Sequence, residues 1–232
     1  MIATVDKRAT GSLERCDLPI TPYAQALELQ RVLHGARRAE LIGDLLLLLE
    51  HPPTYTRGRR SRPDELPAGE AYYRSLGIEV LGTDRGGRVT YHGPGQLVGY
   101  AIVRVRDVVA HVRMLERALI EALALIGIQA RSRAREGPDF TGVWVQERKI
   151  ASIGVHVAGG VSTHGFALNV DNDLAPFGWI VPCGLADVQM TSVACELQRG
   201  AGGPELGLQL RSAIHGALAR ALADLPSSAG TA

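Results

Sequence analysis

Three consecutive segments in the second half of the chain alternate apolar and polar residues, and this alternation constrains the fold more than any other feature. The segments cover residues 142–146, 149–158 and 161–169, with Glu147-Arg148 and Gly159-Gly160 between them. A period of two predicts strands with one buried face, and the short interruptions predict tight turns. We therefore expect an antiparallel meander here.

Helical patterns lie on both sides of this meander in the sequence. The expected helices cover residues 21–38, 108–126 and 204–222. Thr21 and Asp107 are the residue types that cap helix N-termini, and Gly127 is placed to end the second helix. Because these helices do not alternate regularly with strands, the pattern predicts an α+β fold, a mixed and largely antiparallel sheet flanked by helices. We expect one domain over residues 1–225 and a disordered tail over residues 226–232.

The segments between the first two helices are expected to be a strand, a loop and a hairpin. The apolar run 44–50 predicts a buried strand, and residues 54–70, rich in Arg, Pro and Gly, predict a long surface loop. Residues 88–91 and 96–105 predict the two strands of a hairpin around His92-Gly93-Pro94-Gly95. That hairpin would place a glycine cluster at the end of a strand.

The run 85–100, RGGRVTYHGPGQLVGY, has the composition of a binding site. Its five glycines allow the backbone to approach a ligand closely, and Pro94 stiffens the turn between two polar stretches. The spacing misses the G-x-G-x-x-G dinucleotide fingerprint by one residue, and no G-K-[ST] follows a glycine at P-loop spacing. Phosphate binding through either motif is therefore not expected.

This run resembles the signature of the octanoyltransferases of lipoate biosynthesis. Further blocks match in the same order: GVWV at 142–145, KIASIG at 149–154, HGFALNV at 164–170 and IVPCG at 180–184. The resemblance spans almost the whole chain. It implies the mixed-sheet fold of the catalytic domain of biotin and lipoate protein ligases.

The resemblance also implies a reaction, its partners and its site residues. An octanoyl group would pass from octanoyl-acyl carrier protein to a lysine of lipoyl domains, those of 2-oxoacid dehydrogenase complexes and the glycine cleavage H protein, without a cofactor. The catalytic residues would be Cys183, as nucleophile, and Lys149 beside it. The residues implied to contact the acyl substrate are Arg85, Gly86, Gly87, Arg88, Val89, Thr90, Tyr91, His92, Ser152, Ile153, Gly154, His164, Gly165, Phe166 and Ala167.

Physical arguments limit what Lys149 does for Cys183. An ammonium group that lowers the thiol pKa by ~2 units from ~8.5 raises the thiolate fraction at pH 7 from ~3% to ~75%. The accompanying loss of intrinsic nucleophilicity is roughly eightfold, so only a few-fold gain remains. We therefore expect Lys149 to position the acyl group or to accept a proton from the attacking amine. His92 and His164 could orient a carbonyl, relay a proton or simply hold a turn.

Composition excludes several other classes of protein. The chain has 25 Lys and Arg residues against 24 Asp and Glu, so it lacks the excess positive charge that is typical of nucleic-acid-binding proteins. No apolar run reaches ~18 residues and no secretory signal is visible, so we expect no membrane association and a cytoplasmic location. Three cysteines without a CxxC pair, and no HExxH motif, predict neither disulfides nor a metal site, and Cys16 and Cys195 are expected to be structural, with Cys195 in the core.

Two further interpretations remain open. The fold is shared with ATP-dependent lipoate and biotin protein ligases, although adenylation requires no thiol nucleophile. Arg57, Arg59, Arg60 and Arg62 are either a docking patch for an acidic carrier or a solvated loop, and a docking patch is compatible with a non-catalytic carrier-binding module. The charged connection 131–139 has no role that its sequence indicates.

Overall fold

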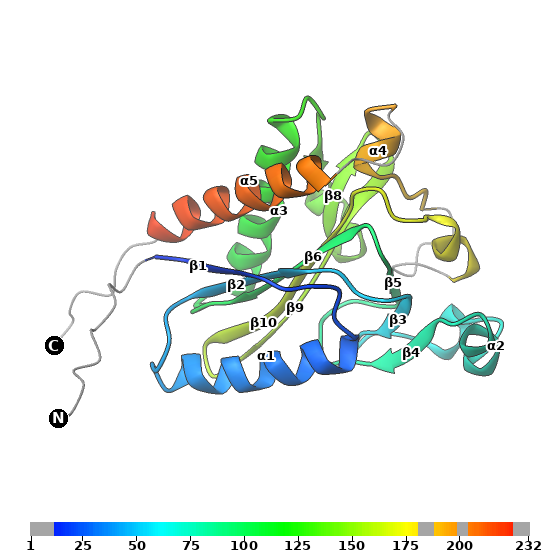
Figure 1. Ribbon diagram of the computed structural model, residues 1–232, viewed down its shortest axis with the longest axis horizontal. Coiled ribbons are helices and arrows are strands. Elements are labelled where there is room, and N and C mark those ends of the chain that lie inside the picture. The colour runs from blue at the N-terminus through cyan, green and yellow to red at the C-terminus, as the bar shows by residue number, and fades with distance from the viewer. Residues whose placement is uncertain (1–11, 181–187, 199–203, 225–232) are drawn as a thin grey trace, which may run out of the picture.

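Two β-sheets form the frame of the protein (Figure 1). The computed structural model describes residues 12–180, 188–198 and 204–224. The larger sheet has the strand order β1 (Glu14–Asp17), β2 (Leu45–Leu49), β6 (Gln96–Ile102), β10 (Val161–Asn169), β9 (Arg148–Ala158), β8 (Gly142–Val145) and β7 (Arg131–Ser132). The smaller sheet has the order β4 (Glu79–Gly82), β3 (Thr54–Arg57) and β5 (Thr90–His92). β1 pairs with β2, and β3 with β4, in parallel, and the remaining pairs are antiparallel.

The meander predicted from alternation is confirmed. β8, β9 and β10 are consecutive antiparallel neighbours, and the turn at Gly159-Gly160 is present as expected. The first turn lies at Gln146-Glu147, one residue earlier than expected, because Arg148 already pairs with Val145 as the first residue of β9. β10 lies between β9 and β6, with Gly165 opposite Gly154 on one side and opposite Tyr100 on the other. The mixed, largely antiparallel sheet with flanking helices confirms the predicted α+β class.

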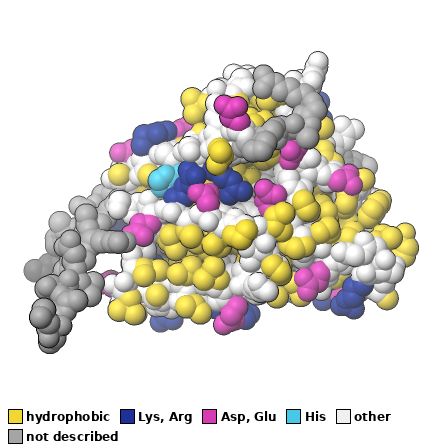
Figure 2. Space-filling model, viewed as in Figure 1, with side chains coloured by type: hydrophobic (Ala, Val, Ile, Leu, Met, Phe, Trp, Pro, Cys, Tyr) yellow, Lys and Arg dark blue, Asp and Glu magenta, His cyan; other side chains and the backbone are white. Residues whose placement is uncertain are grey.

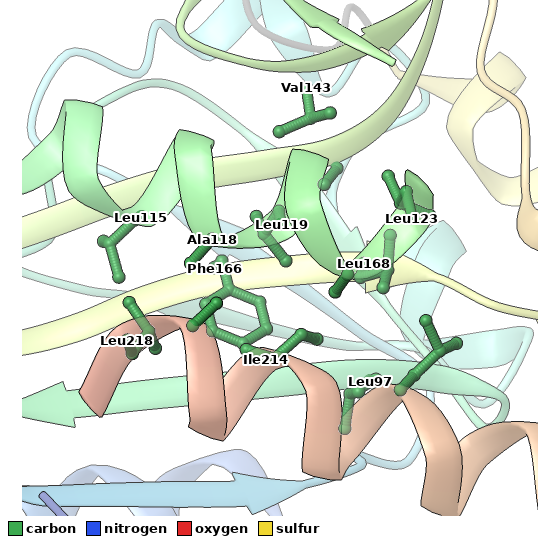
Figure 3. Close-up of a cluster of buried hydrophobic side chains, with 14 of the residues drawn as sticks. Leu97, Leu115, Ala118, Leu119, Leu123, Val143, Phe166, Leu168, Ile214 and Leu218 are labelled. Atoms are coloured by element: carbon green, nitrogen blue, oxygen red, sulfur yellow. The ribbon is translucent and has the colours of Figure 1, made fainter. Parts of the chain in front are cut away.

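Helices cover both faces of the larger sheet. Helix α1 (Tyr23–Arg38) packs on one face, where Leu47 and Leu49 of β2 join its hydrophobic cluster. Helices α3 (Val108–Ala124) and α5 (Pro204–Ala223) cover the other face together with Leu46 and Leu48. Figure 3 shows the side chains between these helices and the strands, among them Leu97, Leu115, Leu119, Phe166, Leu168 and Ile214. Alternate leucines of β2 thus pack against the helices on opposite faces of the sheet. Each fully buried leucine stabilises the fold by ~1.5–3 kcal/mol.

The helix ends agree with the sequence at one cap and differ at another. The Asp107 side chain accepts hydrogen bonds from the N–H groups of Val109 and Ala110, so it is the expected N-cap of α3. Thr21 is not an N-cap, because the helix begins at Tyr23 after Pro22 and the Thr21 hydroxyl donates to the carbonyl of Pro19. The fixed φ of Pro22 starts this helix instead.

Of two expectations for the segment 54–105, one is wrong in part and the other is wrong. The surface loop expected over residues 54–70 does not include its first four residues, because Thr54, Tyr55 and Thr56 are buried in β3, the central strand of the smaller sheet. β5 and β6 do not form a hairpin, since β5 pairs with β3 and β6 with β2 and β10. The glycine-rich turn between them therefore carries the chain from one sheet to the other, and contacts distant in sequence decide the pairing.

The remaining helical elements are short. They are α2 (Glu70–Ser75), α4 (Val193–Glu196) and the 3₁₀ turns η1 (Pro63–Glu65), η2 (Ala134–Glu136), η3 (Pro138–Phe140) and η4 (Ala175–Trp179). Basic and acidic side chains are interspersed over the face that Figure 2 shows, in keeping with the net charge of +1. None of the helices described combines the length and apolar character needed to cross a lipid bilayer.

Candidate active site

A cavity of about 290 Å³ lies where the segment after β4 meets β5, β9 and β10. The sequence motifs that suggested an acyl site, although far apart in the chain, converge on its wall. The predicted site residues that line it are Arg85, Gly86, Gly87, Arg88, Val89, Thr90, His92, Lys149, Ser152, Ile153, Gly154, His164, Gly165, Phe166 and Ala167. The cavity thus joins a cationic and polar wall to an apolar one.

Among the predicted site residues that the structure describes, Tyr91 is the one that does not line the cavity. Its buried ring packs against those of Tyr55 and Phe177 in the core of the smaller sheet. The reason is strand geometry, because successive side chains of a strand point to opposite faces. Thr90 and His92 face the cavity, so Tyr91 between them points away from it.

Cys183 lies outside the described residues. The chain on both sides of residues 181–187 is held by specific contacts. Before it, Ile180 packs in the hydrophobic cluster of the smaller sheet. After it, the carbonyl of Gln189 accepts a hydrogen bond of 2.8 Å from the N–H of Lys149, and the N–H of Thr191 donates to the Lys149 carbonyl at 2.9 Å. Residues 189–191 therefore run beside Lys149.

Lys149 is almost completely buried and lies in the cavity wall. Its ammonium nitrogen is 5.3 Å from the centre of the Trp144 ring, a distance at which the ring face attracts a cation. The adjoining strand makes room for the side chain with Gly142, where a Cβ atom would lie 2.7 Å from Cε of Lys149. Gly142 also has a φ of 136°, so both space and conformation require glycine there.

Arg85 is buried against the smaller sheet. Its Nη2 donates to the carbonyl of Thr56 at 2.6 Å and to the Thr56 hydroxyl at 2.7 Å. The next residue, Gly86, donates its N–H to the Val155 carbonyl at 2.9 Å. A Cβ at Gly154 would lie 2.7 Å from the Gly86 carbonyl oxygen, so glycine is needed where the two backbones approach. Gly86 and Gly154 thus allow two backbone segments to meet in the wall of the cavity.

His92 is held by two polar side chains. Nδ1 is 2.8 Å from Oε1 of Gln96, and Nε2 is 3.3 Å from the hydroxyl of Thr56. Burial lowers the His92 pKa well below its usual value, with the nearby His51 and Arg85 adding to the effect. The imidazole is therefore neutral at physiological pH.

His164 has an unusual backbone for the middle of a strand, with a φ of 60°. Nε2 is 2.7 Å from Oδ1 of Asp84, and Nδ1 is 3.5 Å from the hydroxyl of Tyr23. The hydrogen bond from His164 lowers the Asp84 pKa to about 2, whereas burial lowers the pKa of His164 itself. A neutral His164 therefore donates from Nε2 to the Asp84 carboxylate, leaving Nδ1 to accept from Tyr23. Such strain in a cavity wall is typical of functional positions.

The sequence did not indicate several residues of this wall. Tyr23, Val108, Val112, Pro138, Asp139 and Thr141 also line the cavity, together with Val98 and Tyr100 from the end of the glycine-rich run 85–100. Tyr23 carries the helical pattern of a core residue, so no local signal distinguishes it. Asp84, which anchors His164, directly precedes the glycine-rich run, and this adjacency was the only available signal.

The charged connection 131–139 acquires a structural role. The guanidinium of Arg133 lies 4.6 Å from the ring centres of both Phe140 and Trp144 and pairs with Glu136 and Glu147. The buried Glu116 carboxylate of α3 accepts hydrogen bonds from Ser132 and from the N–H of Gly142. These contacts support Trp144 and Gly142, which adjoin Lys149.

The other two cysteines lie away from the cavity lining. Cys195 is exposed on α4, so the expectation that it belongs to the core is wrong, while Cys16 is partly buried in β1. The apolar pattern around Cys195 belongs to Val193, which is fully buried on the same short helix. Within the described part of the chain, no group of three or more His, Cys, Asp or Glu side chains has the arrangement of a metal site.

Comparison with known proteins agrees with this architecture. The model of the lipoyl protein ligase A/B catalytic domain matches residues 22–213. The octanoyltransferase of Rubrobacter xylanophilus is 51% identical over 199 residues, covering 84% of this chain and 87% of that protein. A crystal structure of lipoate-protein ligase A bound with ATP has a TM-score of 0.64 at 17% identity, covering 94% and 95% of the two chains. The biotin protein ligase from Aquifex aeolicus has a TM-score of 0.50 at 15% identity, covering 91% and 72%.

The structural neighbours share the fold, which confirms the expected likeness to lipoate and biotin protein ligases. The family match and the identity to a relative cover most of the chain. This chain therefore belongs to the lipoyl protein ligase A/B catalytic domain family.

Proposed function

We propose that this enzyme is an acyltransferase that moves an octanoyl group from octanoyl-acyl carrier protein to a lysine of lipoyl domains. The observation that carries the proposal is the convergence of motifs from residues 85–92, 149–154 and 164–167 on one cavity that includes the buried Lys149. The identity of 51% to an octanoyltransferase over most of both chains supports the same activity. The acceptors would be the lipoyl domains of 2-oxoacid dehydrogenase complexes and the glycine cleavage H protein.

The first step forms an acyl-enzyme. The thiolate of Cys183 attacks the carbonyl carbon of the octanoyl thioester, the bond to the carrier sulfur breaks, and the carrier leaves as a thiol after taking a proton. The octanoyl group is now bound to Cys183 as a thioester. Because the donor is itself a thioester, the exchange needs no nucleotide to activate the acyl group.

The second step forms the amide. The ε-amine of the lipoyl-domain lysine attacks the octanoyl carbonyl, the bond to Cys183 breaks, and the enzyme thiol is regenerated. With a pKa of ~10.4 that amine is less than ~0.1% neutral at pH 7, so the step requires a base. We assign this role to Lys149, whose position is fixed by its backbone bonds to the chain after Cys183.

The remaining predicted residues would shape and hold the acyl chain. Val89, Ile153, Phe166 and Ala167 supply apolar surface, and Gly86, Gly87, Gly154 and Gly165 let the backbone come close to it. Arg85, Arg88, Thr90, Ser152, His92 and His164 supply polar groups to the same wall. The reaction needs a reduced thiol, so we propose that it takes place in the cytoplasm.

Intact-mass spectrometry of the enzyme after incubation with octanoyl-acyl carrier protein tests the proposal. The wild type should gain one octanoyl group and lose it when a lipoyl domain is added, whereas Cys183→Ala should gain none. Cys16→Ser and Cys195→Ser are matched controls that should still be acylated. If Cys183→Ala, folded by circular dichroism, kept a tenth of the wild-type turnover, nucleophilic catalysis by Cys183 would be wrong.

The ATP-dependent ligase alternative is tested with the same enzyme. Octanoyl transfer from the carrier should proceed at full rate in EDTA without ATP, and free octanoate with ATP and magnesium should give no modified lipoyl domain. Formation of octanoyl-adenylate, or a carrier-bound octanoyl group that stays inert until ATP is added, would place the enzyme with the ligases.

A further inference from the structure

The arginine-rich segment 57–62 is fixed against the wall of the cavity. The N–H groups of Arg59 and Arg60 donate to the carbonyls of Arg85 and Gly87, both at 3.0 Å. The side chain of Arg60 lines the cavity and is 49% exposed, and Val108, across the lining, is 47% exposed. Because these lining residues reach solvent, the segment forms part of the rim where the cavity opens.

The arginines of this segment differ in how their charge is used. Arg57 pairs with Glu70 at 2.7 Å, and Arg60 pairs with Asp139 at 3.3 Å. Arg59 and Arg62 are exposed, and no carboxylate among the described residues pairs with either.

The acidic neighbours in the following turn are Asp64, which is exposed, and Glu65, which is buried and paired with Arg88 at 2.7 Å. The rim therefore carries a local excess of positive charge with two available guanidinium groups.

This rim adjoins the part of the cavity that contains Lys149. Asp139, the partner of Arg60, belongs to a stretch in which Pro138 and Thr141 also line the cavity. Gly142 follows directly, and its backbone lies against Cε of Lys149. A partner that binds Arg59 and Arg62 would thus deliver its reactive group at the Lys149 end of the cavity.

The charge of the two substrates decides which of them this rim suits. An acyl carrier presents its thioester on an arm that contains a phosphate ester, so the donor brings negative charge to the entrance. The acceptor presents an ammonium group. Guanidinium groups bind phosphate and carboxylate with well-directed hydrogen bonds and repel cations, so a positive rim favours the donor and disfavours the acceptor.

We propose that Arg59 and Arg62 form the docking surface for the anionic acyl carrier that delivers the octanoyl thioester. The inference rests on the proposed octanoyl transfer and adds to it the place where the donor binds. Arg57 and Arg60 serve the fold of the segment through their ion pairs, and Arg59 and Arg62 face the partner.

Steady-state kinetics of Arg59→Glu/Arg62→Glu test this assignment with two donors. With octanoyl-acyl carrier protein at low ionic strength, kcat/KM should fall at least tenfold, and the deficit should shrink as salt screens the charges. With octanoyl-pantetheine, which has neither the phosphate nor the protein, kcat/KM should stay within twofold of wild type. Arg117→Glu, a charge reversal at an exposed position of α3 outside the cavity lining, should leave both donors unaffected.

Other results would overturn the assignment. Equal losses with both donors would mean that the substitutions distort the cavity. An unchanged carrier reaction combined with a higher KM for the lipoyl domain would mean that the rim binds the acceptor. Wild-type kinetics with every substrate would leave these arginines without a role in docking. The proposed octanoyl transfer itself fails only if the wild-type enzyme accepts an octanoyl group from neither donor, so the two failures are distinguishable.

Discussion

Nδ1 of His92 lies 2.8 Å from Oε1 of Gln96, and this contact determines which nitrogen of the imidazole carries the proton. The amide nitrogen of Gln96 donates to the carbonyl of Tyr91 at 3.1 Å and to Oδ1 of Asn169 at 2.9 Å. A backbone carbonyl only accepts, so the amide orientation is set and its oxygen must accept from His92. His92 is therefore the Nδ1–H tautomer, with the lone pair of Nε2 toward the hydroxyl of Thr56.

The tautomer of His92 is open to direct test by nitrogen-detected NMR. Wild-type His92 should show the Nδ1–H pattern and stay neutral at pH 6, because burial keeps its pKa low. Gln96→Glu should raise that pKa, since an adjacent carboxylate favours the imidazolium. Gln146→Glu, at an exposed turn, is the charge control and should change nothing. An Nε2–H pattern in the wild type would contradict the derived network.

The backbone of His164 gives a prediction about stability. At a φ of 60°, alanine costs about 1 kcal/mol more than glycine, whereas asparagine tolerates this region. His164→Ala should therefore be less stable to urea than His164→Gly or His164→Asn by about that amount. All three variants remove the hydrogen bond to Asp84, so the Asp84 pKa should rise from about 2 toward its ordinary value. Equal stabilities for the three would show that the strand relaxes at this position.

His111 should make the enzyme less stable in acid. Burial in the first turn of α3 lowers its pKa to about 4, and its Nε2 has no hydrogen-bond partner among the described residues. The unfolded chain binds a proton below about pH 6.5 but the folded chain only near pH 4, so stability falls as pH decreases through that interval. Between about pH 7.5 and 5 the loss from this residue is about 2 kcal/mol.

Replacing His111 checks the direction of this effect. His111→Leu should reduce the acid-induced loss in the free energy of unfolding, measured with urea at the two pH values. His51, whose pKa burial also lowers to about 4, keeps its own contribution in the variant. An unchanged pH dependence in His111→Leu would mean that the buried imidazole is not neutral in the folded protein.

Sequence patterns correctly predicted the structural elements that depend on residues close together in the chain. The alternation over residues 142–169 and the cap at Asp107 depend on neighbours a few residues away, and the structure contains both as expected. The pairing of β3 with β5 depends on segments more than thirty residues apart, and composition alone made β3 resemble a loop. The prolines before Tyr55 and the arginines and glycine after it concealed a strand whose centre is completely buried.

The site divides in the same way. Its glycine-flanked blocks are visible in the sequence because a close backbone approach leaves a compositional trace, as at Gly154. Tyr23 reaches the same cavity from a helix 141 positions away from His164, and its sequence context is that of any core tyrosine. Asp139 owes its place to ion pairs with Arg60 and Arg88, which no spacing rule predicts.

Substitutions of Lys149 separate charge from proton transfer. Arginine keeps the positive charge of Lys149 but does not release its proton at physiological pH. Methionine keeps the length of the side chain without its charge, and alanine removes both the length and the charge. Acyl-enzyme formation, measured by mass in a single turnover, should persist in Lys149→Arg. Transfer from the acyl-enzyme to a lipoyl domain should fall about a hundredfold or more in all three variants, in the range that loss of a general base produces.

The packing around Lys149 decides how this result is read. Gly142 leaves little room beside Cε, so the larger guanidinium in Lys149→Arg can slow both steps by displacing β8. Lys149→Met fits the same space, and a normal first step in that variant with a slow second step would isolate the loss of the base from any change in packing. If Lys149→Arg instead transferred octanoate to the lipoyl domain at the wild-type rate, a proton-accepting role would be excluded, and the side chain would act through its charge alone.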